Sequence, residues 1–238
     1  MATGVNAGRP RAGQGGQART RLARIAVTQA ARALFLERGY AATTMEAISA
    51  ASGVPPATVY RLFSSKLGIL SDLLDRSIAG DEEDVALADR AHVRAIFTDP
   101  DPRSQLARFA GITSGIMSRA EPLHRILVGA AGSDTDAAAL LEEEARRRDR
   151  GQAQIARSLS RATALRPGLR ERDAADIIHA LMSPEVYRLL VGDRGWPAQR
   201  YQQWLADALI GQLLPGAAGS ATGPGTPSVP ADSPPPAG

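Results

Sequence analysis

The fold is decided by residues 43–66, which read TTMEAISAASGVPPATVYRLFSSK. Thr43 and Glu46 have the spacing of a capping box, in which each side chain bonds the backbone N–H of the other residue. A short helix is therefore expected to begin near Thr44, and Gly53 is expected to end it after about two turns.

The second half of this stretch predicts another short helix. Pro55 and Pro56 suit its first turn, because proline lacks only an N–H that this turn leaves unbonded anyway. Val59, Leu62 and Phe63 then give the helix one apolar side. Two short helices joined by a glycine-containing turn are typical of a helix-turn-helix, which places its second helix in the major groove of DNA.

Longer helices are predicted on both sides of this unit. Residues 19–38 carry an apolar stripe at helical spacing, which consists of Val27, Ala30, Ala31, Leu34 and Phe35. Gly39 is expected to stop that helix. After the two short helices, Ser64 or Ser65 is expected to cap a fourth helix that carries several leucines.

The apolar periodicity continues past residue 80 without a convincing strand, so we predict an all-α fold. The further helices are expected over residues 82–97, 103–119, 121–131, 134–164, 171–191 and 197–214. The expected organisation is a disordered basic tail over 1–18, a helix-turn-helix domain over 19–66, a helical-bundle domain over 67–214, and a disordered Pro/Gly/Ala/Ser-rich tail over 215–238.

Basic residues gather at the N-terminal end of the chain. Residues 1–80 contain ten Lys or Arg against four Asp or Glu, whereas the remaining residues contain 18 against 21. This asymmetry favours a polyanion as the partner of the N-terminal domain. Arg19, Arg21 and Arg24 are expected to form a basic arm that reaches along the DNA backbone or into the minor groove.

Several classes of protein are disfavoured by what the sequence lacks. The absence of Cys excludes disulfides, thiol catalysis and Cys-bound zinc. No phosphate-binding loop, nucleophile elbow or dinucleotide fingerprint occurs. No apolar run approaches the ~20 residues that span a bilayer, and the start lacks the apolar core of a signal peptide. We therefore expect a cytoplasmic protein that is not an enzyme, needs no cofactor and has no membrane partner.

Two alternatives stay open, an all-helical metal-binding enzyme and a helical scaffold protein. Glu121 with His124, and Asp176 with His179, each place a carboxylate and a histidine at the i, i+3 spacing of two-metal helical bundles. Such a site also needs two further inward carboxylates, and Pro122 is expected to place Glu121 at a helix start. No metal ligand is therefore assigned. A scaffold would not explain the basic helix-turn-helix.

The last two predicted helices are too apolar to face water on every side. We expect the helices over 171–191 and 197–214 to pair with their copies across a two-fold axis. The expected assembly is therefore a homodimer with a four-helix interface.

The N-terminal segment also carries a family pattern. Its parts are VTQAARALF at 27–35, GY at 39–40, TMEAI at 44–48, GV at 53–54, TVYRLF at 58–63 and Lys66. In these residues the chain resembles the tetracycline-repressor (TetR) family of transcriptional regulators. The resemblance implies a homodimeric repressor that binds a palindromic operator in double-stranded DNA. It also implies that the domain over 67–214 binds an unknown small-molecule effector, which releases the DNA.

The residues expected to contact DNA are Arg19, Arg21, Arg24, Thr44, Pro55, Pro56, Ala57, Thr58, Tyr60, Arg61 and Lys66. By resemblance, phosphate contacts come from the hydroxyls of Thr44, Thr58 and Tyr60 and the amine of Lys66. Pro56, Ala57 and Tyr60 fall where the family touches base edges, and apolar side chains there favour thymine methyl groups.

An effector cavity is expected inside the helical domain, lined by residue types that also form ordinary cores. The residues expected to line it are Phe109, Ile112, Ile116, Met117, His124, Leu127, His179, Met182 and Tyr187.

Overall fold

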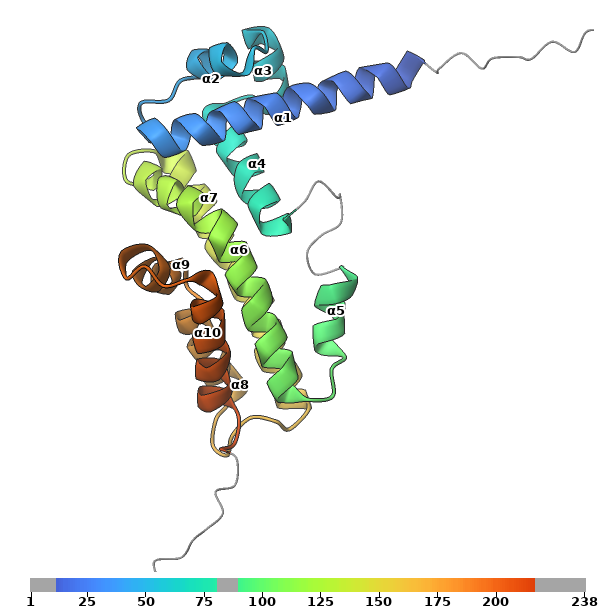
Figure 1. The fold of residues 1–238 in the computed structure, drawn as a ribbon, viewed down its shortest axis with the longest axis vertical. Coiled ribbons are helices and arrows are strands. Elements are labelled where there is room, and N and C mark those ends of the chain that lie inside the picture. The colour runs from blue at the N-terminus through green and yellow to red at the C-terminus, as the bar shows by residue number, and fades with distance from the viewer. Residues whose placement is uncertain (1–11, 81–89, 217–238) are drawn as a thin grey trace, which may run out of the picture.

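The computed structural model describes residues 12–80 and 90–216, and every regular element within these ranges is a helix. The first four helices are α1 (Ala12–Arg38), α2 (Met45–Ser52), α3 (Pro56–Phe63) and α4 (Lys66–Ala79). Figure 1 shows α2 and α3 together at one end of the molecule, with α1 lying across that end and α4 leading away from it. The all-α prediction is confirmed for the described residues.

The remaining helices form the body of the molecule. They are α5 (Ala91–Phe97), α6 (Pro102–Ala131), α7 (Thr135–Arg161), α8 (Glu171–Leu181), α9 (Pro184–Tyr187), a π-helix (Arg188–Asp193) and α10 (Ala198–Leu213). The long helices α6 and α7 pack against each other, and α8 and α10 lie along one side of this pair (Figure 1). None of the described helices is long and apolar enough to cross a membrane.

The two short helices follow from local signals. The hydroxyl of Thr44 accepts a hydrogen bond from the Ala47 N–H at 3.1 Å and caps α2. The cap is therefore one residue later than the capping box predicts, because Thr43 is buried and donates its hydroxyl to the Gly39 carbonyl instead. Gly53 ends α2 in the left-handed region, with φ of 67°.

The N-terminal helices share one apolar core with the C-terminal half of α6. Phe35 of α1, Ile48 of α2 and Val59 of α3 lie in the same buried cluster as Leu123 and Leu127 of α6. The helix-turn-helix is therefore packed onto the C-terminal half of α6, in addition to its connection through α4. This packing fixes the direction in which α3 faces outward.

The first and the fifth helix of the structure begin at other residues than predicted. Helix α1 begins at Ala12, so part of the tail predicted to be disordered over 1–18 is helical. Extending a helix whose later turns are already packed needs no new nucleus, and each added residue gains a hydrogen bond. The helix predicted over 82–97 begins only at Ala91, because Arg90 has extended backbone and is its N-cap residue, and residues 81–89 lie outside the described residues.

The predicted break between 119 and 121 is also wrong. Helix α6 continues through Pro122, so Glu121 lies inside a helix and not at its start. A proline inside a helix costs about 3 kcal/mol. Here α6 packs on α7, α10 and α4 on either side of the proline and buries both Met117 and Leu123, and this packing offsets the local cost.

The predicted helix over 171–191 is divided. Helix α8 stops at Leu181, and Ser183 caps the short α9 by accepting a hydrogen bond from the Val186 N–H at 3.2 Å. The break follows from Pro184, because proline disfavours helical backbone in the residue before it.

Candidate DNA-binding face and effector cavity

Helix α3 presents one exposed face. Val59 and Phe63 are buried and hold the helix against the core, whereas Pro56, Ala57, Tyr60 and Arg61 are exposed. Exposed residues at i, i+1, i+4 and i+5 form a single stripe, and this is the geometry of a helix that inserts into a groove. We call these four residues the reading face.

The reading face is joined to α2 by a hydrogen bond. The Tyr60 hydroxyl donates to the Glu46 carboxylate at 3.2 Å, and this bond raises the pKa of Tyr60. The pKa of Glu46 is lowered by its backbone hydrogen bond and by Tyr60. Because a carboxylate repels phosphate, contact of the Tyr60 hydroxyl with DNA requires this pair to separate. The Tyr60 ring is 46% exposed and free to meet a base edge.

Other predicted contact residues surround this face in different ways. Thr44 is exposed at the start of α2, where its oxygen accepts the capping bond and its hydroxyl also bonds the Glu46 carboxylate, which lowers the pKa of Glu46. Thr58 is half-buried. Pro55 is exposed and precedes α3 as its N-cap residue.

Lys66 is bonded inside the domain. Its Nζ donates to the carbonyls of Tyr40 at 2.7 Å and Thr43 at 2.8 Å, and lies 4.1 Å from the centre of the Tyr40 ring. Burial lowers the pKa of Lys66. An ammonium has three donors, so one donor is left for a phosphate. The first role of this lysine in the structure is to tie the start of α4 to the connection between α1 and α2.

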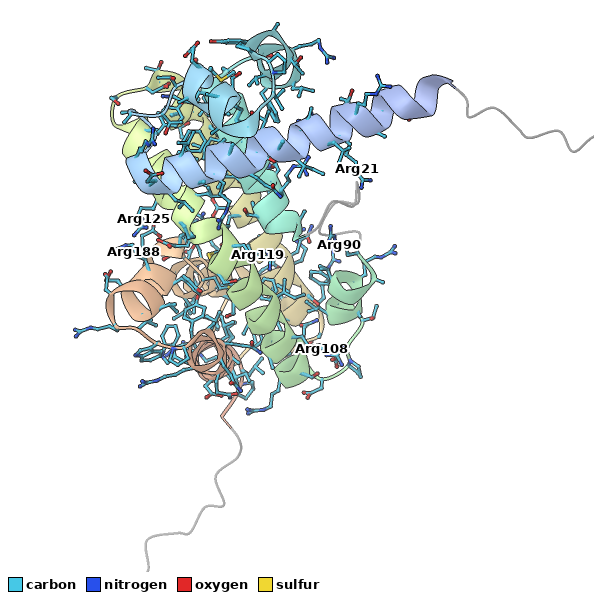
Figure 2. All side chains as sticks on the ribbon, turned by 45° about the horizontal axis from the view of Figure 1, so that its top comes forward. Arg21, Arg90, Arg108, Arg119, Arg125 and Arg188 are labelled. Atoms are coloured by element: carbon cyan, nitrogen blue, oxygen red, sulfur yellow. The ribbon has the colours of Figure 1, made fainter. Side chains whose placement is uncertain are left out.

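The predicted basic arm is part of a helix. Arg19, Arg21 and Arg24 all lie on α1, which is helical from Ala12, so they do not form an extended arm. Arg24 is held by Asp72 of α4, with a nitrogen–oxygen distance of 2.7 Å. Arg19 and Arg21 are exposed on α1. Figure 2 shows Arg21 on the part of α1 that extends beyond the core.

A cavity of about 550 Å³ lies between α4, α5, α6 and α7. The predicted residues that line it are Phe109, Ile112, Ile116, Met117, His124 and Met182. Leu127 is packed in the core beneath the helix-turn-helix, and Tyr187 packs edge-on against Tyr201 with ring centres 4.8 Å apart. His179 is turned to Asp149, at 2.8 Å. These three residues were wrongly assigned to the cavity, because the sequence does not show which side of each helix faces it.

The cavity also has a polar wall that the sequence prediction missed. Glu121 of α6 and Glu144, Arg147 and Arg148 of α7 line it beside His124. Burial raises the pKa of both Glu121 and Glu144. Burial, and then the charge of Arg148, lowers the pKa of His124, which is therefore neutral at neutral pH. The signals in the sequence are the i, i+3 pair of Glu121 and His124, which was considered only for metal binding, and the i, i+4 spacing of Glu144 and Arg148 within a charged run that is otherwise typical of a solvated face.

The pairs considered for metal binding are not assembled into a site. Glu121 and His124 line the cavity, whereas Asp176 is exposed on α8 and His179 bonds Asp149. Within 12–80 and 90–216, no group of three or more His, Asp or Glu side chains is arranged to hold a metal ion.

A helix-turn-helix with an exposed reading face, built on an all-helical body with a cavity, defines the class of helix-turn-helix transcriptional regulators. Residues 27–73 match the family model described as bacterial regulatory proteins, tetR family. The predicted resemblance is thus confirmed, and the N-terminal domain is a TetR-family domain. No curated protein matches the chain.

Solved structures share the fold of the whole body. One is NalD, the secondary repressor of the MexAB-OprM multidrug efflux pump in Pseudomonas aeruginosa, with a TM-score of 0.64, 22% identity, and coverage of 82% of this chain and 98% of NalD. Another is a putative transcriptional regulator from Saccharomonospora viridis in complex with choline, with a TM-score of 0.61, 22% identity, and coverage of 82% and 98%. SmeT in complex with triclosan has a TM-score of 0.60, 18% identity, and coverage of 89% and 99%. The chain has the fold of TetR-family transcriptional regulators.

Proposed function

We propose that this chain is a homodimeric, cytoplasmic transcriptional repressor that binds a palindromic operator and releases it when a small molecule enters the cavity. The observation that carries the proposal is the exposed reading face of α3 on a TetR-family domain. Arg61 makes no hydrogen bond or ion pair with any residue in the described ranges, so its guanidinium is available for a guanine or a phosphate.

Helix α4 supplies the link between cavity and DNA. Leu74, Asp75 and Ile78 of this helix line the cavity, while its first residue, Lys66, bonds the connection between α1 and α2. A ligand that changes the cavity therefore moves the helix to which the reading face is attached. The structures with choline and with triclosan support a small molecule as the occupant. For release to follow, the ligand must bind one spacing of the two reading faces better than the other.

The dimer is supported by apolar side chains that the protomer leaves at its surface. Leu189 is 49% exposed, and Trp204 of α10 is only partly buried although it contacts Trp196 and Tyr201. A second copy placed across α8, the π-helix and α10 would cover these groups. Its two-fold axis would set two reading faces on successive major grooves, which requires a palindromic site.

The operator is obtained by selecting bound fragments from random DNA, and affinity is then measured by fluorescence anisotropy at several salt concentrations. Arg61→Ala and Tyr60→Ala should each cost about 1 to 3 kcal/mol of operator binding. Arg146→Ala is the matched control, because Arg146 is exposed on α7 and pairs only with Glu142 and Glu143 of the same helix. Wild-type affinity in both reading-face variants would contradict the proposal.

A further inference from the structure

The cavity combines an apolar wall with a small number of charged groups. Phe97, Phe109, Ile112 and Ile116 form much of its apolar side. A volume of about 550 Å³ lies within the range of pockets that enclose drug-sized molecules. The charged side chains that line the cavity therefore decide whether a cationic, neutral or anionic apolar molecule binds best.

Glu121 has no partner for its charge. Its side chain is 9% exposed, it lines the cavity, and no hydrogen bond or ion pair joins its carboxylate to any residue in 12–80 or 90–216. The cations that act on it are Arg125 of α6 and Arg188, the first residue of the π-helix, both labelled in Figure 2. Arg188 is bonded to Asp193 at 2.7 Å, and burial raises the pKa of Glu121 more than the two arginines lower it. A carboxylate that lines a cavity and is mostly removed from water favours a ligand that brings the opposite charge.

The arginines of the wall are already compensated. Arg147 bonds Glu144 at 3.1 Å and Asp75 at 3.0 Å. The Nε of Arg148 is buried without a partner, but its positive charge acts on Glu144 and on Glu185. The charged residues that line the cavity are Asp75, Glu121, Glu144, Arg147 and Arg148. The carboxylates outnumber the guanidiniums by one, so an anion would add to an excess of negative charge.

We infer that the cavity takes an apolar organic cation, an amine or a quaternary ammonium, whose charged head lies against Glu121 and whose body packs on Phe97 and Phe109. The inference rests on the proposed function, since it names the class of effector. Because Glu121 is only 9% exposed, water solvates its charge poorly, and a cation placed against the carboxylate compensates that charge.

The test uses ligands that share one alkyl chain and differ in the charge of the head. Decyltrimethylammonium, 1-decanol and decanoate are titrated by calorimetry into the full-length protein at neutral pH, below their micelle concentrations. The cation should bind about tenfold more tightly than the alcohol, and decanoate should bind most weakly. Equal affinities, tighter binding of decanoate, or no binding of any of the compounds would overturn the inference.

Variants of Glu121 then test where the charged head of the ligand binds. Glu121→Gln should weaken binding of decyltrimethylammonium by about tenfold while changing that of 1-decanol by no more than about twofold. Glu121→Asp keeps the charge and should keep the preference for the cation. Glu142→Gln is the control, because Glu142 is exposed on the same body and lies outside the cavity. An unchanged affinity for decyltrimethylammonium in Glu121→Gln would overturn the placement of the charged head at Glu121. The order of affinities of the three ligands for the wild type tests the preference for a cation without any variant.

The two proposals fail in different ways. Adding the same compounds to the protein–operator complex tests release directly. If 1-decanol releases DNA as readily as decyltrimethylammonium, effector control stands and the preference for a cation is wrong. If the protein selects no operator, the proposed function is wrong, while the calorimetric ranking still decides what the cavity binds.

Discussion

Replacing Lys66 by methionine removes two hydrogen bonds that hold α4 to the connection between α1 and α2. The Nζ donates to Tyr40 at 2.7 Å and Thr43 at 2.8 Å and lies 4.1 Å from the Tyr40 ring. Hydrogen bonds to a charged group contribute about 1.5 to 3 kcal/mol each, and a cation–π contact about 0.5 to 1 kcal/mol. Because Lys66 is only half-buried, water replaces part of this loss, so Lys66→Met should lower the free energy of unfolding by about 2 to 3 kcal/mol.

Urea unfolding followed by far-UV circular dichroism measures this effect. Arg61→Met is the matched control, since it removes a cation from an exposed side chain without described partners and should change stability by no more than about 0.5 kcal/mol. Equal midpoints for Lys66→Met and the wild type would refute the internal role. If the third donor of Lys66 also contacts a phosphate, the variant should reduce the salt dependence of operator binding by about one unit of slope. A purely internal role would leave that slope unchanged.

Two other substitutions test the fold and the assembly. Gly53→Ala places a side chain at φ of 67° and should destabilise the protein by about 1 to 2 kcal/mol. Gly129→Ala, inside α6 with open space around the added methyl group, should stabilise the protein by about 0.5 to 1 kcal/mol. Thermal unfolding that ranks the two variants the other way would contradict the strain at the Gly53 turn. Trp204→Glu should turn the proposed dimer into a helical monomer in light scattering, while Leu36→Glu, a change at an exposed leucine of α1, should not. A dimer that survives Trp204→Glu would place the interface elsewhere.

The reading face is the part of the site that the sequence predicted best. The turn at Gly53, the start of α3 at Pro56 and the burial of Val59 and Phe63 depend on residues a few positions apart. Once α3 is a helix with two buried residues on one side, the exposed positions of Ala57 and its neighbours follow from helical geometry. Local signals were therefore sufficient to predict which side of α3 is exposed.

Other features depend on residues that meet only in the folded chain. Lys66 was predicted only to contact phosphate, and the structure adds its bonds to the carbonyls of Tyr40 and Thr43, which lie more than twenty positions earlier in the sequence. Pro122 was expected to break a helix, and packing on three other helices keeps α6 continuous. Neither outcome follows from any local propensity, since long-range packing energies decide both.

The sequence by itself determined the helix-turn-helix, the all-α class and the TetR resemblance, because capping residues, glycines, prolines and helical periodicity act over one or two turns. Only the tertiary structure decided where the cavity lies and which charges face it. A buried Glu121 and a charged run with Glu144 turned inward look the same in sequence as exposed residues. Their burial depends on how α6 and α7 rotate against each other, and that rotation is set by the combined packing of the whole core.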